Sequence, residues 1–219
     1  AGPGLLTALF VLAVAGFGAK VGLAPMHVWL PEVYPAAPIH VSALLSGAMI
    51  NAGFYGIIRS AGMLAPAGEA PEWWGWALLI LGLATALMGI LKATAQSNLK
   101  RLLAYSSVEN MGLMVMGLGT GLIGQSCGNA WIAVLGFSGA LLHMLNHSAF
   151  KGLLFLCAGE VLHATGTVRM QYLGGLQKRL PRLGALFAVG AAAIACLPPF
   201  NGFTGELVLG LSLLDAPAL

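Results

Sequence analysis

The amino-acid sequence predicts an all-α, polytopic bundle of transmembrane helices in which two helices are discontinuous. Of its 219 residues, 58% are hydrophobic and only 8% are charged, whereas about 25% are charged in a typical soluble domain. Apolar runs long enough to cross a bilayer follow one another with only short polar stretches between them. Charged residues near Gly and Pro interrupt the first and the last run. We therefore expect residues 1–219 to form a single transmembrane domain.

The first span is expected to be interrupted within the membrane. Its apolar run, residues 5–19, ends at Lys20 and is followed closely by Gly22 and Pro25. Proline removes a backbone donor and leaves carbonyl groups unpaired, so a charge beside Gly and Pro indicates a helix that breaks. The short stretch over residues 25–34 would complete the span. Breaks of this kind are typical of ion paths in transporters.

Five further spans are expected, and the last one is again interrupted. The break falls at Pro198 and Pro199, after which the apolar run resumes through Glu206. A polar loop is expected between the last two spans, over residues 160–182. The expected spans cover residues 39–63, 73–95, 102–123, 129–158 and 183–214.

The charges of the connecting segments give the chain an orientation. If each span crosses the membrane once, Arg59 is the only basic loop residue on its side. Basic residues are enriched in cytoplasmic loops, so the opposite side, which is rich in Lys and Arg, is expected to be cytoplasmic. The residues on that side are Lys92, Lys100, Arg101, Arg169, Lys178, Arg179 and Arg182.

Several kinds of site are disfavoured by the residues present. Cys127, Cys157 and Cys196 show neither CxxC nor Cys/His ligand spacing, which argues against a bound metal or iron–sulfur cluster. The net charge of +3 is too small and too dispersed to favour nucleic-acid binding. The chain has no GxGxxG, P-loop or nucleophile-elbow motif. We therefore expect no cofactor, metal or nucleotide site.

The fifth span carries a row of titratable residues. His143, His147 and Lys151 are spaced by four residues in HMLNHSAFK, so on an α-helix they share one face. An ionisable group in a membrane is costly and usually faces a protein interior or a water-filled path. An ammonium group without its hydration can load and release a proton, and imidazoles pass protons through either ring nitrogen. The row predicts a proton relay.

Other titratable residues are candidates for proton transfer, but each could also have a purely structural role. Lys20 lies at the first helix break, where it could exchange protons or could be an ordinary interfacial lysine. Glu206 lies just after the second break, where it could exchange protons or could cap a helix. Lys151 could instead snorkel to the surface, and the two histidines could be hydrogen-bonded structural residues. Glu109 could pair with a membrane lysine or lie near the interface. His163 is a possible pathway residue, although a place in a loop is the simpler interpretation.

Four stretches resemble one known family of membrane proteins. The runs are GFGAKVGLAPMHVWLPEVYPAAP, LKRLLAYSSVENMGLMVMGLG, LNHSAFKGLLFLCAGEVLHATGT and LPPFNGFTGE. They resemble the antiporter-like proton-channel subunits of respiratory complex I, Mrp cation/proton antiporters and membrane-bound nickel–iron hydrogenases. The phrases AYSSVENMG and HATGT most resemble the branch of hydrogenase-4 component B and formate hydrogenlyase subunit 3.

The resemblance implies roles for individual residues. Lys20 matches the lysine of the first broken helix, Lys151 the lysine of the central axis, and Glu206 the acidic residue of the second broken helix. His143 and His147 match the helical neighbours of the central lysine. Asn51 departs from the pattern, because many relatives have a lysine there. An amide cannot carry a proton under ordinary conditions, so a relay would depend more on ordered water and the histidines.

The resemblance also implies a function and an assembly. The chain would be the middle and later helices of a larger subunit, truncated at both ends, and would translocate protons in a hydrogenase or complex I-like redox complex. It would hold no redox centre itself and would contact other membrane subunits and a peripheral redox arm in a bacterial or archaeal cytoplasmic membrane. Two alternatives remain, a subunit of an Mrp-type Na⁺/H⁺ antiporter and a structural membrane anchor without transport.

Overall fold

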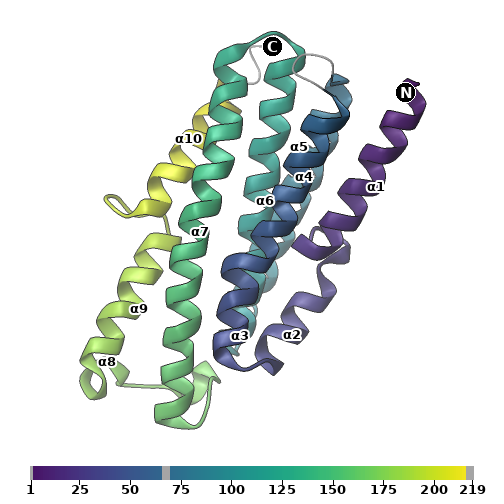
Figure 1. Ribbon diagram of the computed structural model, residues 1–219. Coiled ribbons are helices and arrows are strands. Elements are labelled where there is room, and N and C mark those ends of the chain that lie inside the picture. Colours follow the sequence, from purple (N-terminus) through teal and green to yellow (C-terminus); the bar gives the residue numbers. More distant parts are fainter. Residues whose placement is uncertain (1, 66–69, 216–219) are drawn as a thin grey trace.

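Long helices run side by side through most of the chain, as the computed structural model of residues 2–65 and 70–215 shows (Figure 1). Successive spans point in opposite directions, and each begins near the end of the bundle where the previous span stops. The long helices are α1 (Pro3–Val21), α4 (Ile50–Leu64), α5 (Glu72–Thr94), α6 (Leu99–Ser126), α7 (Ala130–Thr165), α9 (Pro181–Ile194) and α10 (Asn201–Asp215).

Shorter elements complete or connect these spans. A π-helical turn at Leu45–Met49 joins α3 (Ile39–Leu44) to α4, so the two helices form one span. The other short elements are α2 (Leu30–Ala36), α8 (Leu176–Arg179) and the 3-10 turns Met26–Trp29 and Met170–Tyr172.

The outer helices carry an apolar surface suited to lipid. Within the described residues, four stretches are long and apolar enough to cross a membrane: Gly4–Ala36, Ile39–Leu64, Glu72–Thr94 and Ala130–Thr165. Large apolar side chains point outward along them; Leu12 is 67% exposed, Ile80 64% and Leu145 63%. Such a continuous apolar exterior is rare on a soluble monomer. The prediction of an all-α transmembrane bundle is confirmed.

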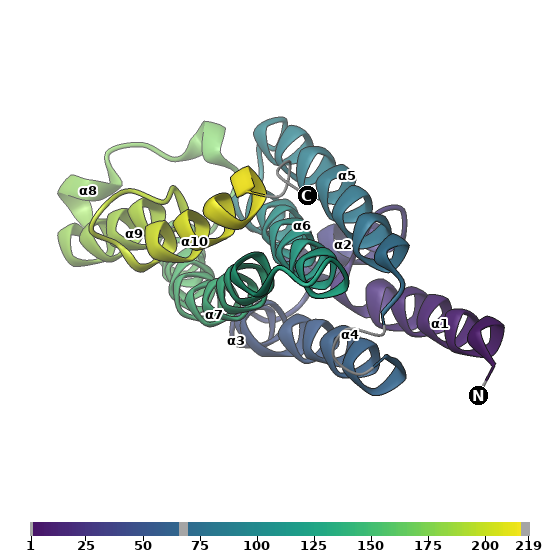
Figure 2. The same ribbon diagram turned by 90° about the horizontal axis from the view of Figure 1, so that it is seen from above.

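Helix α6 is the centre of the bundle. Viewed from above, α5, α7, α10 and α2 surround it, whereas α1 lies at the edge against α4 (Figure 2). Most side chains between Leu99 and Gly124 are buried. Because protein rather than lipid surrounds this helix, it can carry more polar residues than the outer spans can. Its polar side chains therefore face other helices.

Glycines allow α5 and α6 to pack with their backbones in close approach. Gly75, Gly82 and Gly89 recur every seven residues on α5. A Cβ atom at Gly82 would lie 2.7 Å from both the carbonyl oxygen of Gly112 and the amide nitrogen of Met116 on α6. Small residues at such positions are the usual means of close helix contact in membranes. The glycines thus fix the distance between these two helices.

The first span is broken as predicted, and protein groups satisfy much of the exposed backbone. Helix α1 ends at Gly22, whose φ of 84° is the left-handed conformation common at helix ends. The indole of Trp29 donates a hydrogen bond to the carbonyl of Ala19 at 2.7 Å. The amide of Ala24 donates to Thr85 Oγ1 on α5 at 3.1 Å. Non-helical backbone at membrane depth is tolerated where such partners exist.

The last span is also broken as predicted. Helix α9 ends at Ile194, and α10 begins at Asn201 after a loop that Figure 1 shows midway along the bundle. Asn146 on α7 donates to the backbone carbonyl of Asn201 at 2.7 Å, and Asn201 Nδ2 donates back to Asn146 Oδ1 at 3.2 Å. The pair attaches the start of α10 to the middle of α7.

One predicted boundary is wrong. The loop expected over residues 160–182 starts later, because α7 continues to Thr165 and ends at Gly166 with φ 72°. The stretch AGEVLHAT has no Pro and no run of Gly that would stop a helix. A loop start chosen from the polarity of these residues therefore falls too early in the chain. Glu160 and His163 therefore lie on the last turns of α7.

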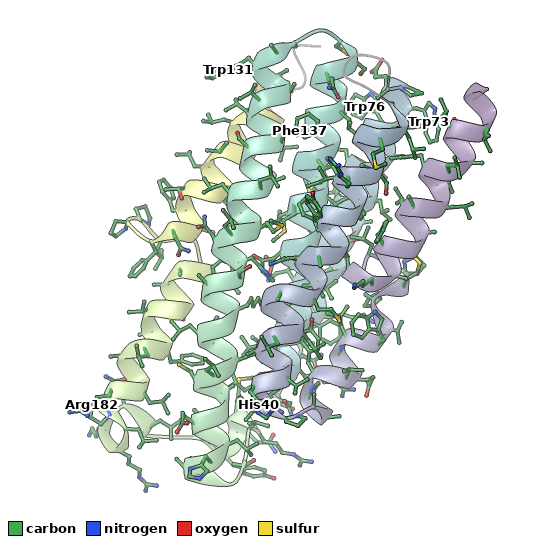
Figure 3. The ribbon with its side chains drawn as sticks, viewed as in Figure 1. His40, Trp73, Trp76, Trp131, Phe137 and Arg182 are labelled. Carbon is green, nitrogen blue, oxygen red and sulfur yellow. The ribbon has the colours of Figure 1, made fainter. Side chains whose placement is uncertain are left out.

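The two ends of the bundle differ in residue type. Trp73, Trp76 and Trp131 lie at the end that is uppermost in Figure 3, whereas His40 and Arg182 lie at the lower end. At the lower end the loop before α6 pairs with the loop after α7, where the amide of Leu99 donates to the carbonyl of Val168 at 2.9 Å. The basic residues of these connections therefore gather on one side.

Candidate functional site

The three residues of the predicted row lie on one face of α7 inside the bundle. His143, His147 and Lys151 are each 0% exposed. The bundle interior, rather than a membrane interface, therefore surrounds the ammonium group of Lys151. Snorkelling does not describe this lysine, because its whole side chain is enclosed.

Helix α6 supplies the partners of Lys151. Its Nζ donates to the backbone carbonyl of Leu103 at 3.0 Å and to Ser106 Oγ at 2.5 Å. Ser106 in turn donates to the same Leu103 carbonyl at 3.1 Å. A buried ammonium group is costly unless such partners accept its hydrogens. The lysine is thus held by one carbonyl and one hydroxyl, with no carboxylate in direct contact within the described residues.

His143 is oriented by an asparagine of α6. Its Nε2 lies 2.9 Å from Asn110 Oδ1, and Asn110 Nδ2 donates to the carbonyl of Ser106 at 2.7 Å. With the amide oxygen facing the ring, Nε2 carries the proton and Nδ1 is free to accept one. Nδ1 faces α10, where a Cβ atom at Gly205 would lie 3.0 Å from it. The glycine keeps α10 close to this ring.

His147 lies between His143 and Lys151 and is held by packing alone. Neither of its ring nitrogens has a hydrogen-bonding partner in the described part of the chain. Its ring meets that of Phe150 edge to face, with the centroids 5.5 Å apart. Buried polar groups are nearly always paired with protein or ordered water. An imidazole with both nitrogens available can accept a proton on one and release it from the other.

Two carboxylates face a cavity beside this row. The cavity has a volume of about 610 Å³ and is lined by Ser106 and Glu109 of α6, Cys196 of the helix break and Glu206 of α10, with mostly apolar residues around them. The thiol of Cys196 donates a hydrogen bond to the carbonyl of Ile194 at 3.8 Å. Ser106 therefore contacts the buried lysine and also borders the space that contains the carboxylates.

Asn51 connects α4 to the middle of α7. Its Nδ2 donates to Ser148 Oγ at 2.6 Å and to the carbonyl of Gly47 at 2.9 Å. Ser148 precedes Lys151 by less than one helical turn. The amide at this position is therefore a bridge between helices, and its Oδ1 is buried without a partner in the described residues.

Two predicted residues lie away from this cluster. Lys20 is exposed on the last turn of α1, where its chain packs near Gly53 of α4, and His163 is exposed at the lower end of α7. Neither side chain makes a hydrogen bond or an ion pair within the described residues. Between Lys20 and the row on α7 lies α4, the helix that carries Asn51.

Three residues that hold the site together were not predicted from the sequence. Ser106 and Asn110 are spaced by four residues on α6, the same spacing as the row on α7. Asn146 attaches the second broken helix. The four-residue spacing of polar side chains within an apolar span was a signal that could have identified Ser106 and Asn110.

Fold and site together define a class of polytopic membrane proteins with two broken helices beside a buried row of ionisable residues. The chain belongs to the NADH:quinone oxidoreductase/Mrp antiporter transmembrane family, whose model matches residues 2–216. The predicted family resemblance is thereby confirmed.

Named relatives include subunits of several complexes. The chain is 44% identical over 222 residues to hydrogenase-4 component B of Escherichia coli, covering 99% of this chain and 33% of that protein. It is 42% identical over 201 residues to formate hydrogenlyase subunit 3 of the same organism, covering 92% and 33%. With an NAD(P)H-quinone oxidoreductase chain 4 of Synechococcus it shares 37% over 216 residues, covering 97% and 38%. The chain thus spans about a third of the length of these relatives.

Solved structures show the same arrangement of helices. A chain of the Mrp complex from Dietzia superposes with a TM-score of 0.85 at 27% identity, over 96% of this chain and 37% of that one. A chain of the archaeal membrane-bound sulfane sulfur reductase, a respiratory membrane complex, superposes with a TM-score of 0.78 at 29% identity, over 92% and 39%.

Proposed function

We propose that this chain is the proton-translocating part of a membrane subunit in a hydrogenase-4, formate hydrogenlyase or complex I-like redox complex. The observation that carries the proposal is the complete burial of Lys151. Two histidines precede it on the same helix face, and a cavity lined by two carboxylates lies next to its partner Ser106. Residues 1–219 would be one domain of a longer subunit. The relatives named above are components of such complexes, so we expect other membrane subunits and a peripheral redox arm as partners.

Protons would move along the buried row and leave through the cavity. Lys151 would receive a proton from the histidine side and pass it by way of Ser106 to Glu109 or Glu206. Coupling to a redox arm would be electrostatic, because a change of charge nearby shifts the balance between protonated lysine and protonated carboxylate. Asn51 would hold the water that connects Lys20 with this row.

The end rich in Lys and Arg would face the cytoplasm of a bacterial or archaeal cell. Support comes from the positive-inside rule and from the gathering of the basic connections at a single end of the bundle. The tryptophans at the other end suit the opposite interface.

Proton movement during turnover tests the proposal directly. The full-length protein, purified with the subunits that accompany it and reconstituted into vesicles, is expected to acidify or alkalinise the lumen while the redox partner turns over. A pH-sensitive dye inside the vesicles measures the change. Turnover without any uncoupler-sensitive pH change would contradict the proposal.

Replacing Ser106 by alanine should slow proton translocation about ten-fold, since one hydroxyl relay step is lost. Ser107→Ala is the matched control. Both hydroxyls donate to the carbonyl of Leu103, but Ser107 contacts Ser46 on the π-helical turn and not Lys151. The ratio of protons moved to substrate turned over measures the effect. Equal effects of the two substitutions would assign Ser106 a structural role only.

The likeness to the Mrp complex supports a second candidate, a subunit of a Na⁺/H⁺ antiporter. The same row would then exchange protons against sodium without a redox partner. Vesicles containing the full-length protein would release protons when sodium is added, with no electron donor present. Proton movement that needs redox turnover and ignores sodium favours the first candidate.

A further inference from the structure

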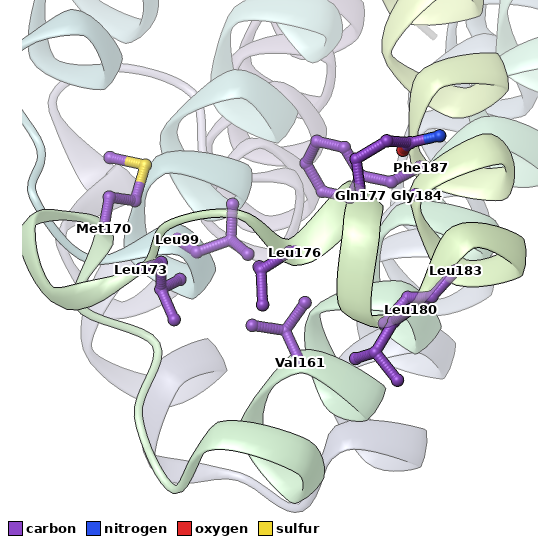
Figure 4. Close-up of a pocket in the computed structure, with 10 residues that line it drawn as sticks. All are labelled: Leu99, Val161, Met170, Leu173, Leu176, Gln177, Leu180, Leu183, Gly184 and Phe187. Atoms are coloured by element: carbon purple, nitrogen blue, oxygen red, sulfur yellow. The ribbon is translucent and has the colours of Figure 1, made fainter.

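A second cavity lies at the basic end of the bundle, next to the carboxylate-lined cavity, with which it shares Leu99, Met170 and Phe187. It has a volume of about 370 Å³ and is formed where α8 and α9 fold back against the end of α7 and the start of α6. In Figure 4, Leu99, Val161, Leu173 and Leu176 lie close together on one side of this cavity. Apart from Gln177 and Gly184 its lining is apolar: Leu99, Val161, Met170, Leu173, Leu176, Leu180, Leu183 and Phe187.

A charged hollow adjoins this apolar cavity. It has a volume of about 390 Å³ and shares Leu180 and Leu183 as a common wall. Arg179 and Arg182 line it, together with one opposing carboxylate, Glu160 of α7. Both arginines are exposed, and neither forms an ion pair with a described residue. Two cationic side chains are thus available next to a leucine-lined space.

The local sequence has a marked excess of positive charge. No acidic residue occurs between Glu160 and Glu206, whereas Arg169 and Lys178 add to the two arginines. Arg182 lies at the end of the bundle opposite to the tryptophans. This is the level at which lipid headgroups meet a membrane protein, and basic clusters there attract anionic lipids.

We propose that these adjoining hollows bind one anionic phospholipid of the bilayer. An acyl chain would occupy the apolar cavity beneath α8, whose volume is within the range of about 300–1,000 Å³ typical of small-molecule sites. The phosphate would lie between Arg179 and Arg182, where guanidinium groups can bind it with two hydrogen bonds each. Glu160 weakens the attraction, so the site favours headgroups with a net negative charge over zwitterionic ones. The acyl-chain cavity borders the carboxylate-lined cavity of the proposed proton path, with which it shares Leu99, Met170 and Phe187, whereas the two arginines do not line that path.

Lipid retention by the full-length protein tests the site. The protein in detergent is mixed with phosphatidylglycerol or phosphatidylcholine of identical acyl chains, and bound lipid is counted by native mass spectrometry. Each basic residue near a membrane surface favours anionic lipid about five-fold. With Glu160 opposing, we expect about ten-fold tighter retention of phosphatidylglycerol than of phosphatidylcholine.

Charge variants should change this preference in opposite directions. Arg179→Gln with Arg182→Gln should reduce it to about two-fold or less, whereas Glu160→Gln should raise it about five-fold. Lys92→Gln is the matched control, because it removes a positive charge at the same end without lining either hollow. A preference that survives the double substitution, or falls equally with Lys92→Gln, would overturn the proposed headgroup site.

A third variant tests the acyl cavity. Leu176→Trp places a larger side chain in the lining of this cavity and should lower retention of both lipids about five-fold while leaving the preference between them. Leu176 lies on the short α8, so the substitution leaves the long helices intact. Unchanged retention, or a wild-type protein that holds neither lipid because another protein segment fills the cavity, would overturn the proposal.

Discussion

Replacing Lys151 by methionine should reduce proton translocation to the background rate while leaving the assembled complex intact. Lys151 is the only fully buried ammonium group on the predicted row, and methionine fills a similar volume without a titratable group. Removing a buried charge together with its need for hydrogen bonds is often neutral for stability. The ratio of protons moved per substrate turned over in reconstituted vesicles measures the loss.

Lys151→Arg separates charge from proton exchange. Arginine keeps the positive charge and can donate to the Leu103 carbonyl and Ser106, but it does not release its proton in proteins. We therefore expect it to lose translocation as well. Lys92→Met is the matched control, because Lys92 is exposed at the end of α5, outside the row. Full translocation by Lys151→Met, or an equal loss in Lys92→Met, would contradict a central role for Lys151.

The broken spans were predictable because their cause is local. Pro25, Pro198 and Pro199 lack the amide hydrogen that a helix interior needs, and this defect is visible in any window of the sequence. The shared face of His143 and Lys151 follows equally from helical periodicity. Such features depend on the chain within one or two helical turns.

The surroundings of the row could not be predicted in the same way. Glu109 shares a cavity with Glu206 only because α10 folds back over α6, a contact between residues far apart in sequence. The exposure of Lys20 depends on α1 meeting only the edge of the bundle. Whether an ionisable residue is buried depends on which helices pack against its own helix. A single sequence does not show which helices pack together.

Because α6 lies at the centre of the bundle, it supplies hydrogen-bond acceptors to the titratable row on α7. The carbonyl of Leu103 and the side chains of Ser106 and Asn110 meet Lys151 and His143 across one helix interface. The opposite side of α6 packs on the glycines of α5. The distance between α5 and α6 therefore sets how far α6 reaches toward α7.

Gly82→Leu should disrupt this interface, with a loss of stability of about 3 kcal/mol. The new side chain would begin at a Cβ atom 2.7 Å from backbone atoms of Gly112 and Met116. Backbone cannot move aside as a flexible side chain can, so the two helices must separate. That separation would also remove the close contacts between small residues on which helix association in membranes depends.

Gly62→Leu is the matched control, because Gly62 on α4 has no atom within 4 Å of an added Cβ. A helix-interior glycine replaced in open space is expected to be neutral or slightly stabilising. Thermal unfolding of the two variants in the same detergent, followed by size-exclusion chromatography, compares them. Gly82→Leu should melt well below the wild type and Gly62→Leu should not. A Gly82→Leu protein that melts with the wild type and still translocates protons would show that α5 does not hold α6 in place.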